Sequence, residues 1–409
     1  MNFSQLFIKL SGVSTLTSLL VLITSFMLGR LMTIEHFGSY SFLQSVLTLL
    51  INILPFGSTL AIAIFINKGT KLKVSKVLDN ALFILMPTIF ITLFIVWLVG
   101  AVFFKSFEIV FLIIIVNSVL MSVNLLFISY LRATQQVRKY AKHFLLYTFS
   151  ITIVGVLGYV LYQEILAFYL TVSLGLLLPF FISIRSLYIE FTIGTFKRKK
   201  RAYFSWSLKY GMPIVASTTV MSFLIVGDKI LLGVLADKST VASYSISALL
   251  ASTTLFIVNN FAATWSSYLF RKLPKLTPVG CYEYYVEYKY KAFIALPFSF
   301  IIYSAQVLLY RLFFSSKYPD LELSIFLLNL SYTLLGISKY FMGYLNYYNK
   351  NFYIFYSAVA SAFILILSSF FTFSNQLFGL SISVFFAFVM LLLLTMTFTD
   401  RVLINNVNK

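Results

Sequence analysis

Long apolar segments separated by short polar connections run through the whole chain. A membrane-spanning helix needs about 20 mostly apolar residues. Six candidate spans lie in the first half, over residues 12–31, 40–66, 80–104, 109–131, 144–162 and 165–184. Six more follow over residues 211–235, 241–270, 292–313, 323–348, 352–373 and 377–399. The pattern predicts an all-α integral membrane protein of about twelve transmembrane helices.

One polar motif occurs once in each half of the chain. Ser39-Tyr40-Ser41 and Ser243-Tyr244-Ser245 each come shortly after a long apolar segment. The first of these segments carries Gly29-Arg30 and the second carries Gly227-Asp228-Lys229. This recurrence suggests that one unit is used twice.

The strongest run of charge, residues 196–201, separates the two halves. It predicts an N-terminal six-helix lobe over residues 1–195 and a C-terminal six-helix lobe over residues 211–409. Residues 196–210 are expected to form a basic cytoplasmic linker and an interfacial helix. Because each half has six spans, both enter the membrane in the same orientation, a layout of transporters with parallel repeats. We therefore expect two pseudo-symmetric six-helix bundles around a central cavity.

Composition agrees with a membrane protein and gives an orientation. Hydrophobic residues make up 60% of the chain and charged residues 11%, whereas soluble domains are about 45–50% apolar. Basic clusters fall on alternate loops, so the positive-inside rule predicts that both termini are cytoplasmic. The positive residues behind the net charge of +19 thus gather on the predicted cytoplasmic side of the membrane. It predicts contacts with anionic membrane lipids and no nucleic-acid partner.

Few residues suit enzyme chemistry. The single cysteine, Cys281, falls in a predicted cytoplasmic loop, so no intrachain disulfide can form. His36 and His143 are predicted on opposite sides of the membrane and cannot share a metal. Phosphate-binding loops and dinucleotide fingerprints are not found. We predict no catalytic activity, no cofactor and no metal site.

Ionisable residues inside the spans are the candidate functional groups: Arg30, Asp228, Lys229 and Arg311. Each would cost about 2.5–3.5 kcal/mol at the bilayer centre, and such residues usually have a function. Residues three or four positions away supply no opposite charge to Arg30 or Asp228. Alternatively, Arg30 and Arg311 lie near the outer ends of their spans and reach the interface, as long basic side chains do.

Two groups of residues resemble a known family. Tyr210-Gly211-Met212-Pro213 and Gly227–Gly233, followed by Tyr244, are similar to the second half of bacterial polysaccharide flippases. Gly29-Arg30-Leu31 and Phe37–Tyr40 are similar to their opening signature. These O-antigen (Wzx-type) flippases belong to the multidrug, oligosaccharidyl-lipid and polysaccharide exporter (MOP) superfamily. The family commonly has Arg after the Asp; Lys229 is a point charge and lacks the planar fork of arginine.

The resemblance implies a function and a site. The substrate would be a polyprenyl-pyrophosphate-linked oligosaccharide, an O-antigen (lipopolysaccharide) or capsule repeat unit, moved to the outer leaflet of the bacterial cytoplasmic (inner) membrane. Arg30, Lys229 and Arg311 would bind this substrate, with alternating access between the lobes. Asp228 would couple transport to an ion or serve in a structural ion pair. A polysaccharide polymerase and chain-length proteins are implied as partners.

Three alternatives make different demands on the sequence. A cation-coupled multidrug exporter of the same superfamily favours acidic groups in its cavity, whereas here one membrane acid, Asp228, stands against three cations. An O-antigen polymerase or ligase typically has a large outer loop, and the predicted outer loops are short. A structural membrane protein or channel would show no charge-dependent transport of a lipid-linked sugar.

Overall fold

The computed structural model describes residues 3–54, 109–134, 136–190, 200–348, 350–372 and 376–407. Every regular element in these ranges is helical. Nine helices in them are long and apolar enough to cross a membrane. The predicted all-α membrane fold is therefore confirmed. The predicted span at 80–104, and the part of the span at 40–66 beyond Leu54, lie outside the described residues.

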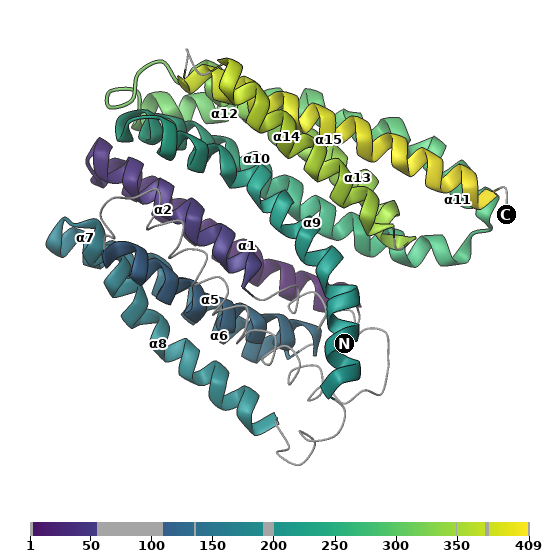
Figure 1. Cartoon of the computed structure of the whole chain (residues 1–409), viewed down its shortest axis with the longest axis horizontal. Helices are drawn as coiled ribbons and strands as arrows, with labels where there is room; N and C mark the ends of the chain where they lie inside the picture. Colours follow the sequence, from purple (N-terminus) through teal and green to yellow (C-terminus); the bar gives the residue numbers. More distant parts are fainter. Residues whose placement is uncertain are drawn as a thin grey trace. The chain divides into compact units, whose positions relative to one another are not determined.

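The chain divides into two compact units, Met1–Ser222 and Phe223–Lys409. In the first unit, α5 packs against α2 and α8, and α6 packs against α1. The helix from Val137 to Tyr162 is continuous and contains one π-helical turn, η1. Figure 1 shows the elements of this unit: α1 (Phe3–Leu31), α2 (Ile34–Ile53), α5 (Ile109–Ala133), α6 (Val137–Phe149), η1 (Ser150–Val154), α7 (Gly155–Tyr162) and α8 (Ile165–Glu190).

The second unit is built around α13, which packs against α10, α12 and α15. Gly336 of α13 lets the side chain of Val258 on α10 approach closely, because a Cβ at Gly336 would lie 2.6 Å from a Val258 methyl carbon. The elements of this unit are α10 (Lys238–Lys272), η3 (Leu273–Lys275), α11 (Pro278–Lys289), η4 (Tyr290–Ile294), α12 (Ala295–Phe313), α13 (Glu322–Tyr347), α14 (Asn351–Thr372) and α15 (Gln376–Val407). Helix α9 (Lys200–Leu235) belongs to both units.

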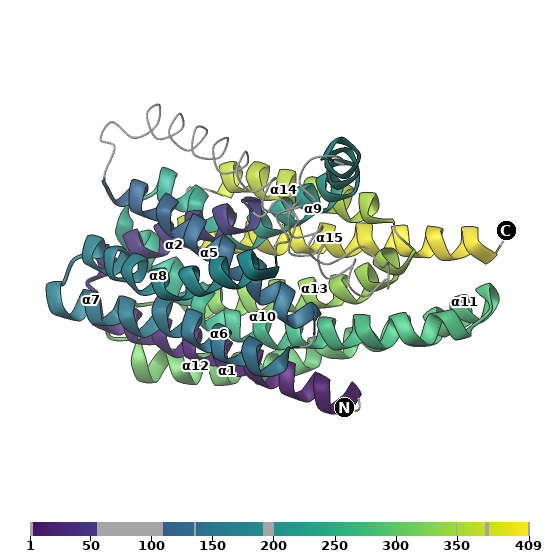
Figure 2. The ribbon, with the colours of Figure 1, turned by 90° about the horizontal axis from the view of Figure 1, so that it is seen from below.

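Several helices are longer than a bilayer requires. α9 has 36 residues, α10 has 35 and α15 has 32, whereas about 20 residues span the hydrocarbon core. Figure 2 shows α11 and the C-terminal part of α15 extending together at one end of the second unit. Polar residues continue these helices beyond their apolar parts. This is possible because the backbone hydrogen bonds of a helix form within the helix and do not depend on the membrane.

This continuity changes the predicted position of Cys281. The residue lies in α11 and only 4% of it is exposed. Its thiol contacts the backbone oxygen of Leu273 at 3.6 Å. The prediction of a loop was wrong because the polar residues after Pro278 form a helix that leads into α12. Likewise, residues 203–210 are part of the uninterrupted helix α9.

Candidate functional site

Asp228 is the one acid of the predicted set, and it is buried. Asp228 lies on α9, and only 1% of the residue is exposed. The Tyr244 hydroxyl of α10 donates a hydrogen bond to Oδ2 at 2.6 Å, and the backbone N–H of Lys229 donates to Oδ1 at 2.7 Å. A carboxylate out of water needs such partners, since an unpaired one is very costly. The Gly-Asp-Lys and Ser-Tyr-Ser motifs of the second half thus meet in one buried site.

The first unit repeats this arrangement without the acid. The Tyr40 side chain, in the first Ser-Tyr-Ser motif, interacts with that of Ser25 on α1, whose hydroxyl donates a hydrogen bond to the Val21 backbone oxygen. Ser25 lies six residues before the end of α1, and Asp228 lies seven residues before the end of α9. The two positions are therefore equivalent in depth. Ser25, and not Arg30, holds the place in the first repeat that Asp228 holds in the second.

The predicted cations lie in different settings. Arg30 is exposed in the last turn of α1, in the first unit. Lys229 is half-buried on α9 and interacts electrostatically with the neighbouring Asp228. Arg311, in the last turn of α12, has a side chain that is 64% exposed, and its Nε lies 2.8 Å from Glu322 Oε1. The guanidinium of Arg311 is thus paired at a helix end.

An additional cation lies in α13. The ammonium of Lys339 donates a hydrogen bond to the Asn259 side-chain oxygen on α10. Lys339 is half-buried and Asn259 is exposed. Lys339 is not among the predicted site residues, although a lone lysine inside the predicted span at 323–348 is the same signal that indicated Arg30 and Arg311.

A buried polar network joins three helices of the second unit. Gln306 of α12 donates to the hydroxyls of Thr253 and Thr254 at 2.9 and 3.0 Å. Asn329 of α13 donates to the Ser299 backbone oxygen at 2.9 Å and accepts from Thr254. Backbone and side-chain polar groups in a membrane must be satisfied within the protein. The network therefore ties α10, α12 and α13 together.

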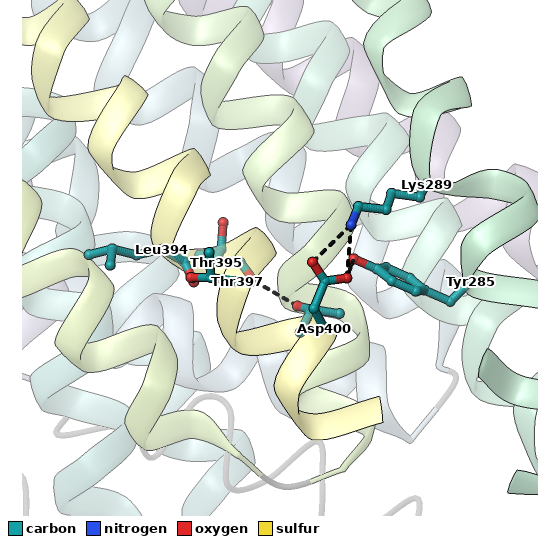
Figure 3. A network of polar contacts seen from close by, with 7 residues as sticks. Tyr285, Lys289, Leu394, Thr395, Thr397 and Asp400 are labelled. Carbon is teal, nitrogen blue, oxygen red and sulfur yellow. Dashed lines mark hydrogen bonds and ion pairs between the residues drawn. The ribbon is translucent and has the colours of Figure 1, made fainter. Parts of the chain in front are cut away.

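A second ion pair links α11 to α15 (Figure 3). Lys289 Nζ lies 2.9 and 2.8 Å from the two carboxylate oxygens of Asp400, and the Tyr285 hydroxyl donates to Oδ1 at 2.6 Å. The Lys289 and Asp400 side chains are 14% and 30% exposed. Asp400 lies one residue beyond the predicted last span, and Lys289 lies in a predicted loop. No pattern within the spans could therefore indicate this pair.

The two histidines occupy separate sites in the first unit. His143 Nε2 lies 3.1 Å from Asn124 Oδ1 and 3.0 Å from Ser183 Oγ, and the residue is buried. His36 Nδ1 lies 3.2 Å from the Tyr159 hydroxyl. In the part of the chain that the structure describes, no three His, Cys, Asp or Glu residues gather as metal ligands would.

Asp237 precedes α10 in the short connection from α9. Its carboxylate accepts hydrogen bonds from the hydroxyls of Ser239 and Thr240. These bonds hold the pKa of Asp237 below its usual value, because they favour the charged form. The residue therefore stays ionised at neutral pH, and an anion at a helix N-terminus is stabilising.

The family of the chain follows from its sequence. Residues 5–268 match the model of the family described as "Polysaccharide biosynthesis protein". This match covers more than half of the chain, which therefore belongs to that family. No curated protein matches the sequence.

Solved structures share the fold over almost the whole chain. An inward-facing multidrug resistance MATE family transporter of the MOP superfamily has a TM-score of 0.75 at 14% identity, covering 97% of this chain and 98% of its own. The lipid II flippase MurJ, in an inward closed conformation, has a TM-score of 0.72 at 14% identity, covering 95% and 86%. A MOP superfamily transporter from Pyrococcus furiosus, described as having a binding pocket of reverse polarity, has a TM-score of 0.64 at 15% identity, covering 97% and 94%.

These comparisons define the class of protein. The chain is a polysaccharide biosynthesis protein with the two-lobed, all-α fold of MOP-superfamily transporters. The resemblance found in the sequence motifs is confirmed at the level of family and fold.

Proposed function

We propose that the chain is a flippase for a polyprenyl-pyrophosphate-linked oligosaccharide, the repeat unit of an O-antigen or a capsule. It moves the head group from the cytoplasmic to the outer leaflet of the bacterial inner membrane, with both termini in the cytoplasm. Family membership supports a role in polysaccharide biosynthesis. The fold is shared with a lipid II flippase, and the mechanism in our proposal is alternating access between the two lobes.

The observation that carries the proposal is the excess of cations over acids within the spans predicted from the sequence. Arg30, Lys229, Arg311 and Lys339 stand against Asp228, whose carboxylate is already held by Tyr244 and a backbone N–H. A pyrophosphate head group needs charge-assisted hydrogen bonds, which are about twice as strong as neutral ones. The lipid tail needs none and can stay in the bilayer.

Arg311 has a different place in this proposal from the other cations. Its guanidinium is exposed and paired with Glu322 at the end of α12. We assign it to the predicted outer end of the path, where exchange of a carboxylate for a phosphate would accompany release. Arg30 and Lys229 are assigned to binding during translocation.

The proposed function is tested by deleting the coding sequence of this chain and then complementing the deletion strain with this chain alone. We expect loss of surface polysaccharide on deletion, accumulation of the lipid-linked intermediate in the inner leaflet, and recovery on complementation. Normal polysaccharide without the chain would contradict the proposal. Loss of resistance to organic cations with unchanged polysaccharide would instead indicate a multidrug exporter, whose fold is similar.

A further inference from the structure

Lys339 and Asn259 lie beside a row of aromatic side chains. The Trp265 ring of α10 stacks on Tyr340 of α13, with centroids 4.5 Å apart and planes at 21°. Its Nε1–H donates to the Tyr340 backbone oxygen at 3.3 Å. Tyr268, one helical turn after Trp265, has its ring centroid 5.9 Å from that of Trp265. The Lys339–Asn259 hydrogen bond and these aromatic contacts thus join the same two helices, α10 and α13.

The aromatic row continues onto α11. The side chains of Tyr268 and Tyr284 interact electrostatically. The rings of Tyr284 and Tyr288 lie 4.6 Å apart, and Lys291 Nζ lies 4.0 Å above the Tyr288 ring. The row therefore runs from one lysine to another across three helices of the second unit.

Lys339 lies inside its span, toward one end of α13. Lys339 lies eight residues before the end of α13, which corresponds to about 12 Å along the helix. That end of α13 is on the predicted cytoplasmic side. Trp and Tyr gather at the membrane–water interface, which is also the level of the phosphates of membrane lipids.

An aromatic belt alone does not explain Lys339 and Asn259. A membrane anchor needs aromatic rings in the interface, but no lysine bonded to an amide within a span. Among the described residues, no carboxylate pairs with Lys339, and its ammonium donates to the exposed Asn259 side chain. The ammonium has three donors, so it can bind an anion in addition. Tyr268 is 50% exposed and Trp265 is half-buried, which leaves aromatic surface accessible beside the cation.

We propose that Lys339, Asn259, Trp265 and Tyr268 form a loading subsite for a saccharide pyrophosphate head group. The inference rests on the proposed function. The Lys339 ammonium binds a pyrophosphate oxygen, and the Asn259 amide binds a neighbouring oxygen or hydroxyl. The rings of Trp265 and Tyr268 stack against the first sugar, because their negative faces attract its polarised C–H groups.

The subsite is tested by binding to the purified full-length chain in nanodiscs of neutral phosphatidylcholine. The probes are a short-chain prenyl-pyrophosphate monosaccharide, inorganic pyrophosphate and a methyl glycoside. We expect Lys339→Gln to weaken both pyrophosphate probes at least tenfold. Trp265→Leu is expected to weaken the saccharide-containing probes tenfold while binding of inorganic pyrophosphate stays within twofold. Trp265→Phe keeps an aromatic face and should retain most of the affinity.

Lys350→Gln, an exposed lysine after the end of α13, is the matched control and should bind as wild type. Unchanged affinities in folded Lys339→Gln and Trp265→Leu proteins would overturn the subsite, while complementation by the wild-type chain would leave the proposed function standing. A wild-type chain that neither binds the prenyl probe nor complements the deletion would contradict both.

Discussion

Replacing Arg30 and Lys229 together by glutamine is expected to abolish surface polysaccharide in a deletion strain that the wild-type chain complements. Hydrogen bonds to charged groups contribute about 1.5–3 kcal/mol each. The double variant would lose two such hydrogen bonds to the pyrophosphate during translocation. Translocation should then slow by about a hundredfold or more, because 1.4 kcal/mol corresponds to a factor of ten. Glycan analysis of the surface measures the result.

Conservative exchanges separate charge from shape at these two positions. Arg30→Lys and Lys229→Arg keep the positive charge and should retain most of the polysaccharide. Lys238→Gln, at the exposed start of α10, removes an equal charge elsewhere and should have no effect. Wild-type polysaccharide from the double glutamine variant at normal protein level would refute the cationic path.

Replacing Asp228 by leucine is expected to destabilise the second unit strongly. Tyr244 would lose its acceptor at 2.6 Å, and Lys229 would lose its neighbouring carboxylate. Leaving a buried polar group unsatisfied costs about 1–3 kcal/mol. Asp228→Asn keeps an oxygen that accepts from Tyr244, so its stability and most of its transport should be retained. Thermal unfolding and glycan analysis together measure the two effects.

The asparagine variant distinguishes the two roles considered for Asp228. The hydrogen bond that its carboxylate accepts from Tyr244 of α10 indicates a positioning role for α9 against α10. Loss of transport in Asp228→Asn at wild-type stability would contradict this role and assign the acid to ion coupling. A matched pair of tyrosine variants provides the control. Tyr244→Phe removes a bond to a carboxylate and should cost more stability than Tyr40→Phe, whose partner is Ser25.

The apolar pattern predicted the helical class and most of the described helices. It did so because twenty consecutive apolar residues have few other stable structures than a membrane helix. It did not predict where long helices end. The helices from Lys200 and Pro278 begin well before their apolar parts, and Cys281 is consequently helical and buried. A helical segment outside the membrane can be polar, so the hydropathy of the sequence does not reveal it.

The candidate site was predicted only as single residues. The cost of a charge in lipid correctly drew attention to Asp228, which is buried. Its partner Tyr244 is sixteen residues away on the next helix, and such pairing depends on how helices pack. For the same reason, Asn259 could not be matched to Lys339, eighty residues apart. The periodicity of apolar residues describes each helix separately and does not predict which side chains of two helices meet.

The repeated motif acquires a more specific meaning from the structure. In each half, the tyrosine of Ser-Tyr-Ser interacts with a residue at a similar position along the preceding helix, Ser25 or Asp228. The spacing in sequence obscured this equivalence, since Arg30 precedes Tyr40 by ten residues and Asp228 precedes Tyr244 by sixteen. The two repeats therefore share a pairing between these two helices and differ in charge.

The central claim is that this chain translocates a lipid-linked oligosaccharide along a cationic path. It is tested most directly with proteoliposomes that contain the purified chain and a fluorescent polyprenyl-pyrophosphate oligosaccharide, using a membrane-impermeant quencher to follow its exchange between leaflets. We predict translocation with the wild-type chain and background rates with Arg30→Gln/Lys229→Gln. Equal rates in protein-free liposomes, or an unimpaired double variant, would contradict the account.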